Sequence, residues 1–425
     1  MSPLKRIGVF AIKAGCLAAL VVGIVWNVRF GVADLVARRN QPDSTRLAMR
    51  LMPVDGAYSA QLADEIYAID PASAKSLLQT AVQRNPYDAA SWIQLGLLSE
   101  AGDDLPQAEQ ALLRAASVDS TFLPSWSLAN FYFRRENAAR FWYWAQRAAQ
   151  MSPDDATPLF RLAWYVNPSV AEIENRLQIK RPTVAAQFLD FLKARGDPQA
   201  VTEAASHLLT ASSKDTAEAL LGACDWLIAN QRPDLALPLW NGLAARGQIP
   251  YGPLAAASPD VVTNGKFGKS PTSRGFDWRL KTVDGVSSFL NLSPNALGFE
   301  FSGDEPDSFL LMDQTVPVQQ QENYALVVNY RTTGISPGSG IAWLVTDHRS
   351  GAVLARTGSL SAEQGGEALA CFAAPEGAAF VNLSLLYQRQ PGTVRVEGRL
   401  ALKEVRLSGA TAEHCPGAEN LHFRG

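Results

Sequence analysis

The sequence predicts a multidomain chain with three parts: a single N-terminal transmembrane helix, an α-helical solenoid and a C-terminal all-β sandwich or jelly roll. Three observations support this. An apolar run lies near the N-terminus, large residues recur at a fixed interval through the middle, and the hydrophobic periodicity changes from helical to alternating near residue 261. The expected parts are an anchor and spacer (1–44), repeats (45–250), a linker (251–262), a sandwich (263–410) and a tail (411–425).

The composition is that of a folded protein without a strong electrostatic bias. Hydrophobic residues make up 47% of the 425 residues and charged residues 19%, which is too apolar for general disorder. The net charge is −3, and the lysines and arginines are scattered along the chain. We therefore expect no nucleic-acid partner.

Residues 7–28 form an apolar stretch whose one charged residue is Lys13. At about 1.5 Å per residue, a helix of this length spans a hydrocarbon core of about 30 Å. Trp26 lies near one end, where aromatic residues favour the membrane interface. Lys5, Arg6 and Lys13 favour an N-terminus in the cytoplasm. This predicts a single-pass inner-membrane protein with its bulk in the periplasm.

A cleaved signal peptide and a buried helix of a soluble domain are the alternatives for this stretch. The run is longer than a usual signal-peptide core, and no clean A-x-A site follows it before the arginines, so we favour an uncleaved anchor. The polar segment 38–44 is expected to be a short spacer.

The middle of the chain repeats large and small residues at intervals of 34. Large aromatics keep this interval at Tyr58, Trp92, Trp126 and Phe160. Smaller residues keep it later in each unit, at Ala74 and Ala108, Leu78 and Leu112, and Ala81 and Ala115. Such a unit is a helical hairpin that must stack on copies of itself to bury its apolar faces.

This period and residue order resemble the tetratricopeptide repeat (TPR). The resemblance covers roughly residues 45–247, about six hairpins, and is clearest in the first, second and last. It implies a superhelix with an extended concave face of the kind that holds peptides or partner proteins. We therefore expect a protein partner bound through the helical repeats.

The third hairpin departs from the repeat in a run of four aromatic residues, Phe141, Trp142, Tyr143 and Trp144. Successive helical residues point about 100° apart, so the four cannot share one face. At least one is expected on the surface or in the concave groove. The run is therefore either core plus packing for the next repeat, or a partner-binding patch.

After about residue 261 the chain reads as ten short candidate strands separated by Gly, Pro, Ser and Asp, which predicts two packed sheets. The region opens with N-G-x-F at 264–267 and continues to G-F-D-W at 275–278. This order resembles a family of jelly-roll carbohydrate-binding modules. Relatives of that fold bind sugars, bind other ligands, or bind nothing known.

The resemblance implies a polysaccharide as a second partner. Aromatic faces stack on sugar rings, and charged or amide groups bind the hydroxyls. The candidate glycan-binding residues are Tyr387, Gln388, Arg389, Trp278 and Trp343. Both tryptophans are expected more often in the core of such a fold, whereas Tyr387, at a strand end, is the candidate expected to be the most exposed.

The four cysteines are Cys16, Cys224, Cys371 and Cys415, and none has a Cys-x-x-Cys or Cys/His ligand spacing. We therefore expect no metal site. Cys371 and Cys415 lie in or after the predicted sandwich, where an oxidising compartment would permit a disulfide. Sequence alone leaves that pairing open, because it gives no distance.

The sequence has no GxGxxG after a strand, no GxxxxGK[ST] and no HExxH. We expect no catalytic residue and no cofactor. The acidic pair Glu300 and Asp304 resembles ordinary surface acids more than a glycosidase pair. The end of the tail, 419–425 (ENLHFRG), is expected to be disordered.

The order of anchor, repeats and sandwich looks like that of accessory proteins of polysaccharide assembly or export. The sequence thus predicts a membrane-anchored, extracytoplasmic scaffold whose repeats bind a protein and whose sandwich faces glycan or a second partner. A purely structural assembly factor without sugar binding is the alternative. A glycan-active enzyme is the least expected class.

Overall fold

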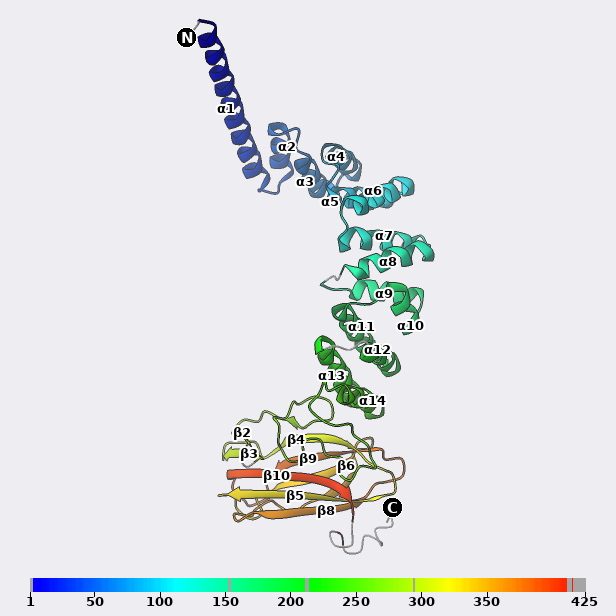
Figure 1. The fold of residues 1–425 in the computed structure, drawn as a ribbon, viewed down its shortest axis with the longest axis vertical. Helices are drawn as coiled ribbons and strands as arrows, with labels where there is room; N and C mark the ends of the chain where they lie inside the picture. The colour runs from blue at the N-terminus through cyan, green and yellow to red at the C-terminus, as the bar shows by residue number, and fades with distance from the viewer. Residues whose placement is uncertain (1–2, 152–153, 211–213, 293–294, 411–414, 416–425) are drawn as a thin grey trace. The chain divides into compact units, whose positions relative to one another are not determined.

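The computed structural model describes residues 3–151, 154–210, 214–292, 295–410 and 415 (Figure 1). The chain divides into two compact units, Met1–Val184 and Ala185–Gly425. The sequence places its main boundary near residue 250. The contacts instead group the last two helical pairs with the sandwich.

The first unit begins with one long helix, α1 (Pro3–Ala37), drawn in dark blue in Figure 1. Its segment Gly15–Ala37 is long and apolar enough to cross a membrane, and most of its side chains are exposed. Membrane anchors and signal sequences share this length and composition. The helix continues past the predicted span 7–28, and α2 (Pro42–Leu51) starts inside the predicted spacer 38–44.

In the described part of the chain, twelve further helices follow as six consecutive pairs, as the repeat period predicts. Four pairs lie in the first unit: α3 (Gly56–Ile66) and α4 (Pro71–Arg84), α5 (Ala89–Ala101) and α6 (Leu105–Val118), α7 (Phe122–Arg134) and α8 (Ala138–Gln150), α9 (Thr157–Val166) and α10 (Val170–Leu177). The last two pairs are α11 (Pro182–Arg195) and α12 (Pro198–Thr210), α13 (Lys214–Ala229) and α14 (Pro233–Ala245).

Aspartate caps and small residues explain the local form of these pairs. Asp70 and Asp104 each accept a hydrogen bond from a first-turn N–H of the helix that follows, which satisfies a group with no partner inside the helix. Gly96 lets α5 approach α6, because a Cβ there would lie 2.7 Å from Cγ of Leu112. Ala108 and Leu112 are fully buried, as their repeat positions predict.

The second unit carries the sandwich, whose ten described strands match the predicted ones. They are β1 (Arg279–Leu280), β2 (Val286–Leu292), β3 (Asn295–Ser302), β4 (Ser308–Pro317), β5 (Asn323–Thr333), β6 (Ile341–Asp347), β7 (Val353–Arg356), β8 (Gly366–Ala373), β9 (Phe380–Gln388) and β10 (Glu397–Gly409).

The strands form two antiparallel sheets around one core. One sheet has the order β1-β4-β9-β6-β7 and the other β2-β3-β10-β5-β8, and every pairing within them is antiparallel. A single apolar core draws residues from both sheets, among them Leu383 and Leu385 of β9 and Leu400 and Leu402 of β10. The core therefore lies between the two sheets, as in a sandwich.

The segment predicted as a linker, 251–262, packs against its neighbours. Asn241 of α14 donates from Nδ2 to the carbonyl oxygen of Leu254 (2.8 Å), and its Oδ1 accepts from the Leu254 N–H (2.7 Å). The ring of Tyr251 stacks on Trp240 of α14, with 5.9 Å between centroids. This stretch therefore joins the helices to the sandwich through specific contacts rather than as a free spacer.

Cys371 and Cys415 form a disulfide, which resolves the pairing that sequence left open. Cys371 lies on β8, and Cys415 is buried beside Ala325 and Val327 of β5. The segment predicted to be disordered, 419–425, lies outside the described residues.

Candidate functional site

The helical unit has an apolar groove between α3 and α5 with a volume of about 360 Å³. Its lining comes from the first helices of two consecutive pairs and from α4: Ala63, Asp64, Tyr67, Leu78, Gln94, Leu97, Leu98 and Ala101. Most of these side chains are apolar. The groove therefore suits an apolar side chain of a bound segment.

The repeat itself builds this groove. Ala63 and Leu97 occupy equivalent positions 34 residues apart, as do Tyr67 and Ala101. The small alanines leave space, while Tyr67 (56% exposed) and Leu97 (45% exposed) present apolar surface to it. Asp64 is the one charged side chain of the lining and is exposed. A bound segment with a basic residue beside its apolar one would complement this site.

The aromatic run of α8 divides between core and surface. Phe141 is fully buried and Trp142 is 8% exposed, so the prediction of a partner-binding role is wrong for these two. Tyr143 is 53% exposed, which confirms that at least one of the four lies on the surface. Arg147 lies over the rings of Tyr143 and Trp144, at 5.8 and 5.4 Å from their centroids. Of the four predicted residues, Tyr143 and Trp144 therefore stay candidates for a partner-binding patch.

The three aromatic candidates for glycan binding are core residues. Trp278, Trp343 and Tyr387 are 0% exposed, and the two tryptophan rings lie 5.6 Å apart. The expectation that Tyr387 is exposed is therefore wrong. Side chains alternate along a strand, so Leu385 and Tyr387 of β9 share the inward face. The alternation along β9 therefore places Tyr387 in the core, although the polar residues that follow it in the sequence predicted exposure.

The two polar candidates lie at the end of β9. Gln388 is exposed, and Arg389 forms an ion pair with Asp307, with 3.2 Å between Nη1 and Oδ1. Arg395 joins the same carboxylate at 3.3 Å. Hydrogen bonds from Arg389 and Arg395 lower the pKa of Asp307 below its ordinary value. In the described part of the sandwich, none of the largely exposed hydrophobic side chains is aromatic.

A polar hollow of about 680 Å³ lies instead over the sheet that contains β5 and β10. Its lining is Lys266, Asn295, Asn329, Tyr330, Gln364, Gly365, Gly366, Glu367, Lys403 and Glu404. Asn329 and Glu404 face each other across the two strands, and Nδ2 of Asn329 donates to Oε2 of Glu404 (3.4 Å). Amide, ammonium and carboxylate groups of this kind bind hydroxyl-rich ligands.

Sequence reasoning missed this hollow because its residues come from separate segments that only the sheet pairing brings together. The alternation in β5 could have indicated it, because Asn329 lies between the buried Val328 and Tyr330 and must face outward.

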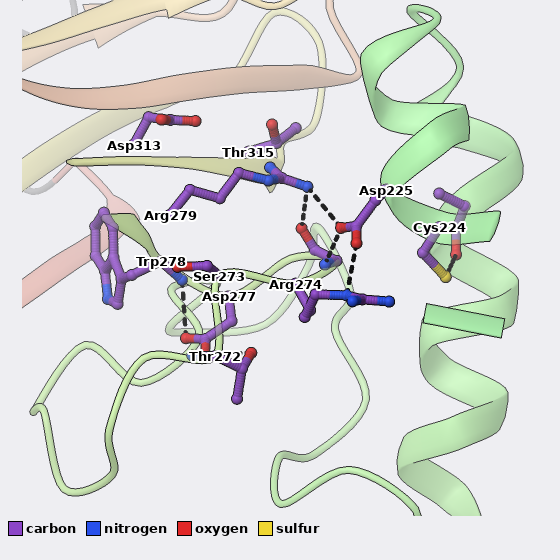
Figure 2. A network of polar contacts seen from close by, with 12 residues as sticks. Cys224, Asp225, Thr272, Ser273, Arg274, Asp277, Trp278, Arg279, Asp313 and Thr315 are labelled. Carbon is purple, nitrogen blue, oxygen red and sulfur yellow. Dashed lines mark hydrogen bonds and ion pairs between the residues drawn. The ribbon is translucent and has the colours of Figure 1, made fainter. Parts of the chain in front are cut away.

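Figure 2 shows a polar network that joins α13 to the segment before β1 within the second unit. Asp225 of α13 forms ion pairs with Arg274 (Nε to Oδ2, 2.7 Å) and Arg279 (Nη2 to Oδ1, 3.2 Å). The side chain of Arg279 also donates to the carbonyl oxygen of Gly275 (2.7 Å). These charges satisfy one another, so the network fits a structural role at this junction better than a ligand site.

No protein-family model and no curated protein matches the chain. Solved structures of two kinds do. PilF of Pseudomonas aeruginosa is 15% identical, over 53% of this chain and 92% of that chain, with a TM-score of 0.27. YrrB, a TPR protein with an unusual peptide-binding site, is 12% identical over 48% of this chain and 93% of that chain, with a TM-score of 0.26.

The second kind is represented by TmCBM61 in complex with β-1,4-galactotriose. It is 14% identical over 36% of this chain and 100% of that chain, with a TM-score of 0.27. The helical pairs and the two packed sheets of this chain, rather than these similarities, carry the fold assignment. One apolar N-terminal helix, TPR-like pairs and a two-sheet sandwich are the predicted parts, and all three are present.

Proposed function

We propose that this protein is a membrane-anchored, extracytoplasmic scaffold whose helical repeats hold a segment of a partner protein. The role is one of binding and positioning without catalysis or cofactor. We infer that it acts in the assembly or export of an envelope polysaccharide. This inference is an analogy with proteins that have the same order of anchor, repeats and sandwich.

Two features support the location. The exposed side chains of α1 include Leu20, Val21, Val25 and Trp26, which need an apolar environment. The disulfide between Cys371 and Cys415 suits an oxidising compartment such as the periplasm. We therefore infer an inner-membrane anchor with both units on the extracytoplasmic side.

The observation that carries the binding role is the groove between α3 and α5. It is apolar, open to solvent and built by repeat-equivalent residues, with Asp64 at its edge. A segment with one large apolar side chain next to Lys or Arg fits its chemistry.

Co-purification from native membranes tests this role. The variant Leu97→Glu puts a charge into the groove and is expected to lose the partner that the wild-type chain retains. Leu113→Glu is the matched control, since Leu113 lies on α6 with 39% exposure and outside the lining. Equal recovery of the same partner by both variants would contradict a role for the groove.

Glycan recognition is a second candidate function, favoured by the polar hollow over β5 and β10. Affinity electrophoresis of the detergent-solubilised chain in gels containing envelope polysaccharide tests it. Retardation that Asn329→Ala abolishes and Asn291→Ala preserves would support it, because Asn291 is exposed on β2 outside the hollow. A folded chain that no such polysaccharide retards supports the rival, a purely structural assembly factor.

A glycan-active enzyme is the class that the geometry favours least. Glu300, one of the two acids considered for such chemistry, forms an ion pair with Arg399 across β3 and β10, with 2.7 Å between Oε1 and Nη2. Glycosyltransferase and export genes beside the gene would favour the polysaccharide setting over the purely structural one.

A further inference from the structure

The anchor helix is continuous with the core of the first unit. Ala33 and Ala37, in the last turns of α1, are buried with Ala48, Met52 and Tyr58. The Nε2 of Gln61 also donates a hydrogen bond to the carbonyl oxygen of Ala37 (2.8 Å). Since α1 has no break before these contacts, the helix that would cross the membrane also sets the orientation of α2 and α3.

Helix α2 returns alongside α1 (Figure 1). A turn at 38–41 reverses the chain, and Ala48 and Met52 then pack against Ala33. The ten residues of α2 span about 15 Å at a rise of about 1.5 Å per residue. Its carboxyl end therefore lies level with the turn of α1 that holds Arg29, where the predicted membrane span ends.

The surface at this level combines unpaired cations with exposed apolar groups. In the part of the chain that the structure describes, Arg29 and Arg50 form no ion pair, whereas Arg38 and Arg46 are paired with neighbouring aspartates. Val54, in the loop after α2, is 60% exposed, and Phe30 of α1 is 47% exposed. Apolar groups beside arginines are the chemistry that favours the headgroup layer of a bilayer.

We propose that the carboxyl end of α2 and the loop after it dock onto the anionic surface of the membrane that α1 crosses. Arg29 and Arg50 bind lipid phosphates, and Val54 enters the boundary between headgroups and acyl chains. Each arginine near an anionic surface contributes about 1 kcal/mol, or about fivefold in partition. This inference rests on the proposed anchoring by α1. It adds that the first unit is held against the bilayer at one defined end.

Site-directed fluorescence on the full chain in lipid nanodiscs tests the docking. Cys16→Ala gives the background, because Cys224 is buried and Cys371 and Cys415 are bonded. An environment-sensitive fluorophore is attached at Val22→Cys, Val54→Cys or Ile69→Cys in separate variants. Ile69 is the matched control: it is apolar and 87% exposed, and it lies near Pro42 and Asp43, at the opposite end of α2.

The nanodiscs contain equal parts phosphatidylcholine and phosphatidylglycerol, with a headgroup-attached spin label as quencher. We expect blue-shifted emission at position 22, strong quenching at position 54 and little quenching at position 69. The double variant Arg29→Gln/Arg50→Gln, or nanodiscs of phosphatidylcholine alone, should remove most of the quenching at 54. Arg114→Gln, an exposed arginine on α6, should not.

The outcomes separate the two claims. Blue-shifted emission at 22 with equal quenching at 54 and 69 would overturn the docking and leave the anchor intact. Water-exposed emission at 22 would overturn the anchor itself. Quenching at 54 that is unchanged by the double arginine variant and by lipid charge would overturn the assignment to anionic headgroups.

Discussion

Asp225 accepts a hydrogen bond from the backbone N–H of Gly275, with 2.6 Å between Oδ1 and N. The two residues are 50 positions apart, one on α13 and the other before β1. The same carboxylate pairs with Arg274 and Arg279. The last helical pair and the sandwich are thus tied at one acidic side chain, and we expect them to unfold together.

Replacing this carboxylate tests the tie. Asp225→Ala removes the carboxylate that two arginines and one backbone N–H share, so we expect a loss of about 1.5–3 kcal/mol in the free energy of unfolding. The side chain is 29% exposed, which favours the lower end of that range. Urea unfolding followed by tryptophan fluorescence measures the change. Asp190 is an exposed acid on α11, and Asp190→Asn is the control. Equal losses in the free energy of unfolding for the two variants would show that the contacts of Asp225 do not stabilise this junction.

Gly275 is required for a second reason. Its φ is +54°, and an added Cβ would lie 2.4 Å from the ring of Trp240 on α14. We expect Gly275→Ala to destabilise the second unit by at least about 1–3 kcal/mol through backbone strain and steric overlap. Gly252→Ala, where a Cβ meets open space, should change the unfolding midpoint little. Equal unfolding midpoints of the two variants would disprove the contact between Trp240 of α14 and this turn.

Asp277 predicts a pH dependence with a definite sign. Its carboxylate is fully buried and accepts from the N–H and hydroxyl of Thr272 (2.6 and 2.8 Å) and the hydroxyl of Tyr251 (2.8 Å). Burial raises the pKa of Asp277 above its ordinary value, an effect that these hydrogen bonds partly offset. The folded state therefore holds this proton more tightly than the unfolded state does.

The contribution of Asp277 to the free energy of unfolding is therefore largest below the ordinary aspartate pKa. It falls as pH rises through the raised pKa of the folded state, and it does not change further above that pKa. Asp277→Asn should not show this pH dependence. At neutral pH it should lower the free energy of unfolding by about 1–3 kcal/mol, because the amide nitrogen of the new side chain faces hydrogen-bond donors. The difference between wild-type and variant unfolding free energies across acidic pH measures this. A difference that does not change with pH would contradict the prediction.

The disulfide closes a loop with a sequence separation of 44. Cys415→Ser should lower the free energy of unfolding of the sandwich by about 2–4 kcal/mol, mainly by freeing the unfolded chain. Reduction should lower the wild-type melting temperature and leave that of the variant unchanged. Equal melting temperatures of the oxidised wild type and the variant would argue against a stabilising role.

Thiol labelling gives an independent check on the core of the last helical pair. Burial raises the pKa of Cys224 to about 12, so its thiol is both inaccessible and protonated at neutral pH. Iodoacetamide should modify Cys224 only after unfolding. Rapid labelling of the folded chain would show that α13 and α14 pack less closely than described.

Much of the fold followed from periodicity. The 34-residue interval located the helical pairs because each unit buries the same positions, as Ala108 and Leu112 show. The strands followed from short alternating runs between turns. The candidate site was harder to predict. Tyr387 stands beside polar residues at a strand end, which predicts exposure, yet the alternation of β9 turns it inward.

The contacts that define sites and junctions join residues far apart in the sequence. Asp225 and Gly275, or Asn329 and Glu404, meet only once helices and strands have packed. Nothing in the local pattern of either partner indicates the other. The contacts of the linker are of the same kind, since Tyr251 and Leu254 have their partners on α14.

Site-specific photo-crosslinking in living cells tests the scaffold most directly. A photoreactive amino acid at Leu97 should give one discrete protein adduct, and Ala101→Trp, which fills the same groove, should abolish it. The same photoreactive group at Leu113 of α6, outside the lining, should give no such adduct. An adduct that survives the filled groove, or an identical adduct from Leu113, would contradict the assignment of the groove between α3 and α5 as the partner site.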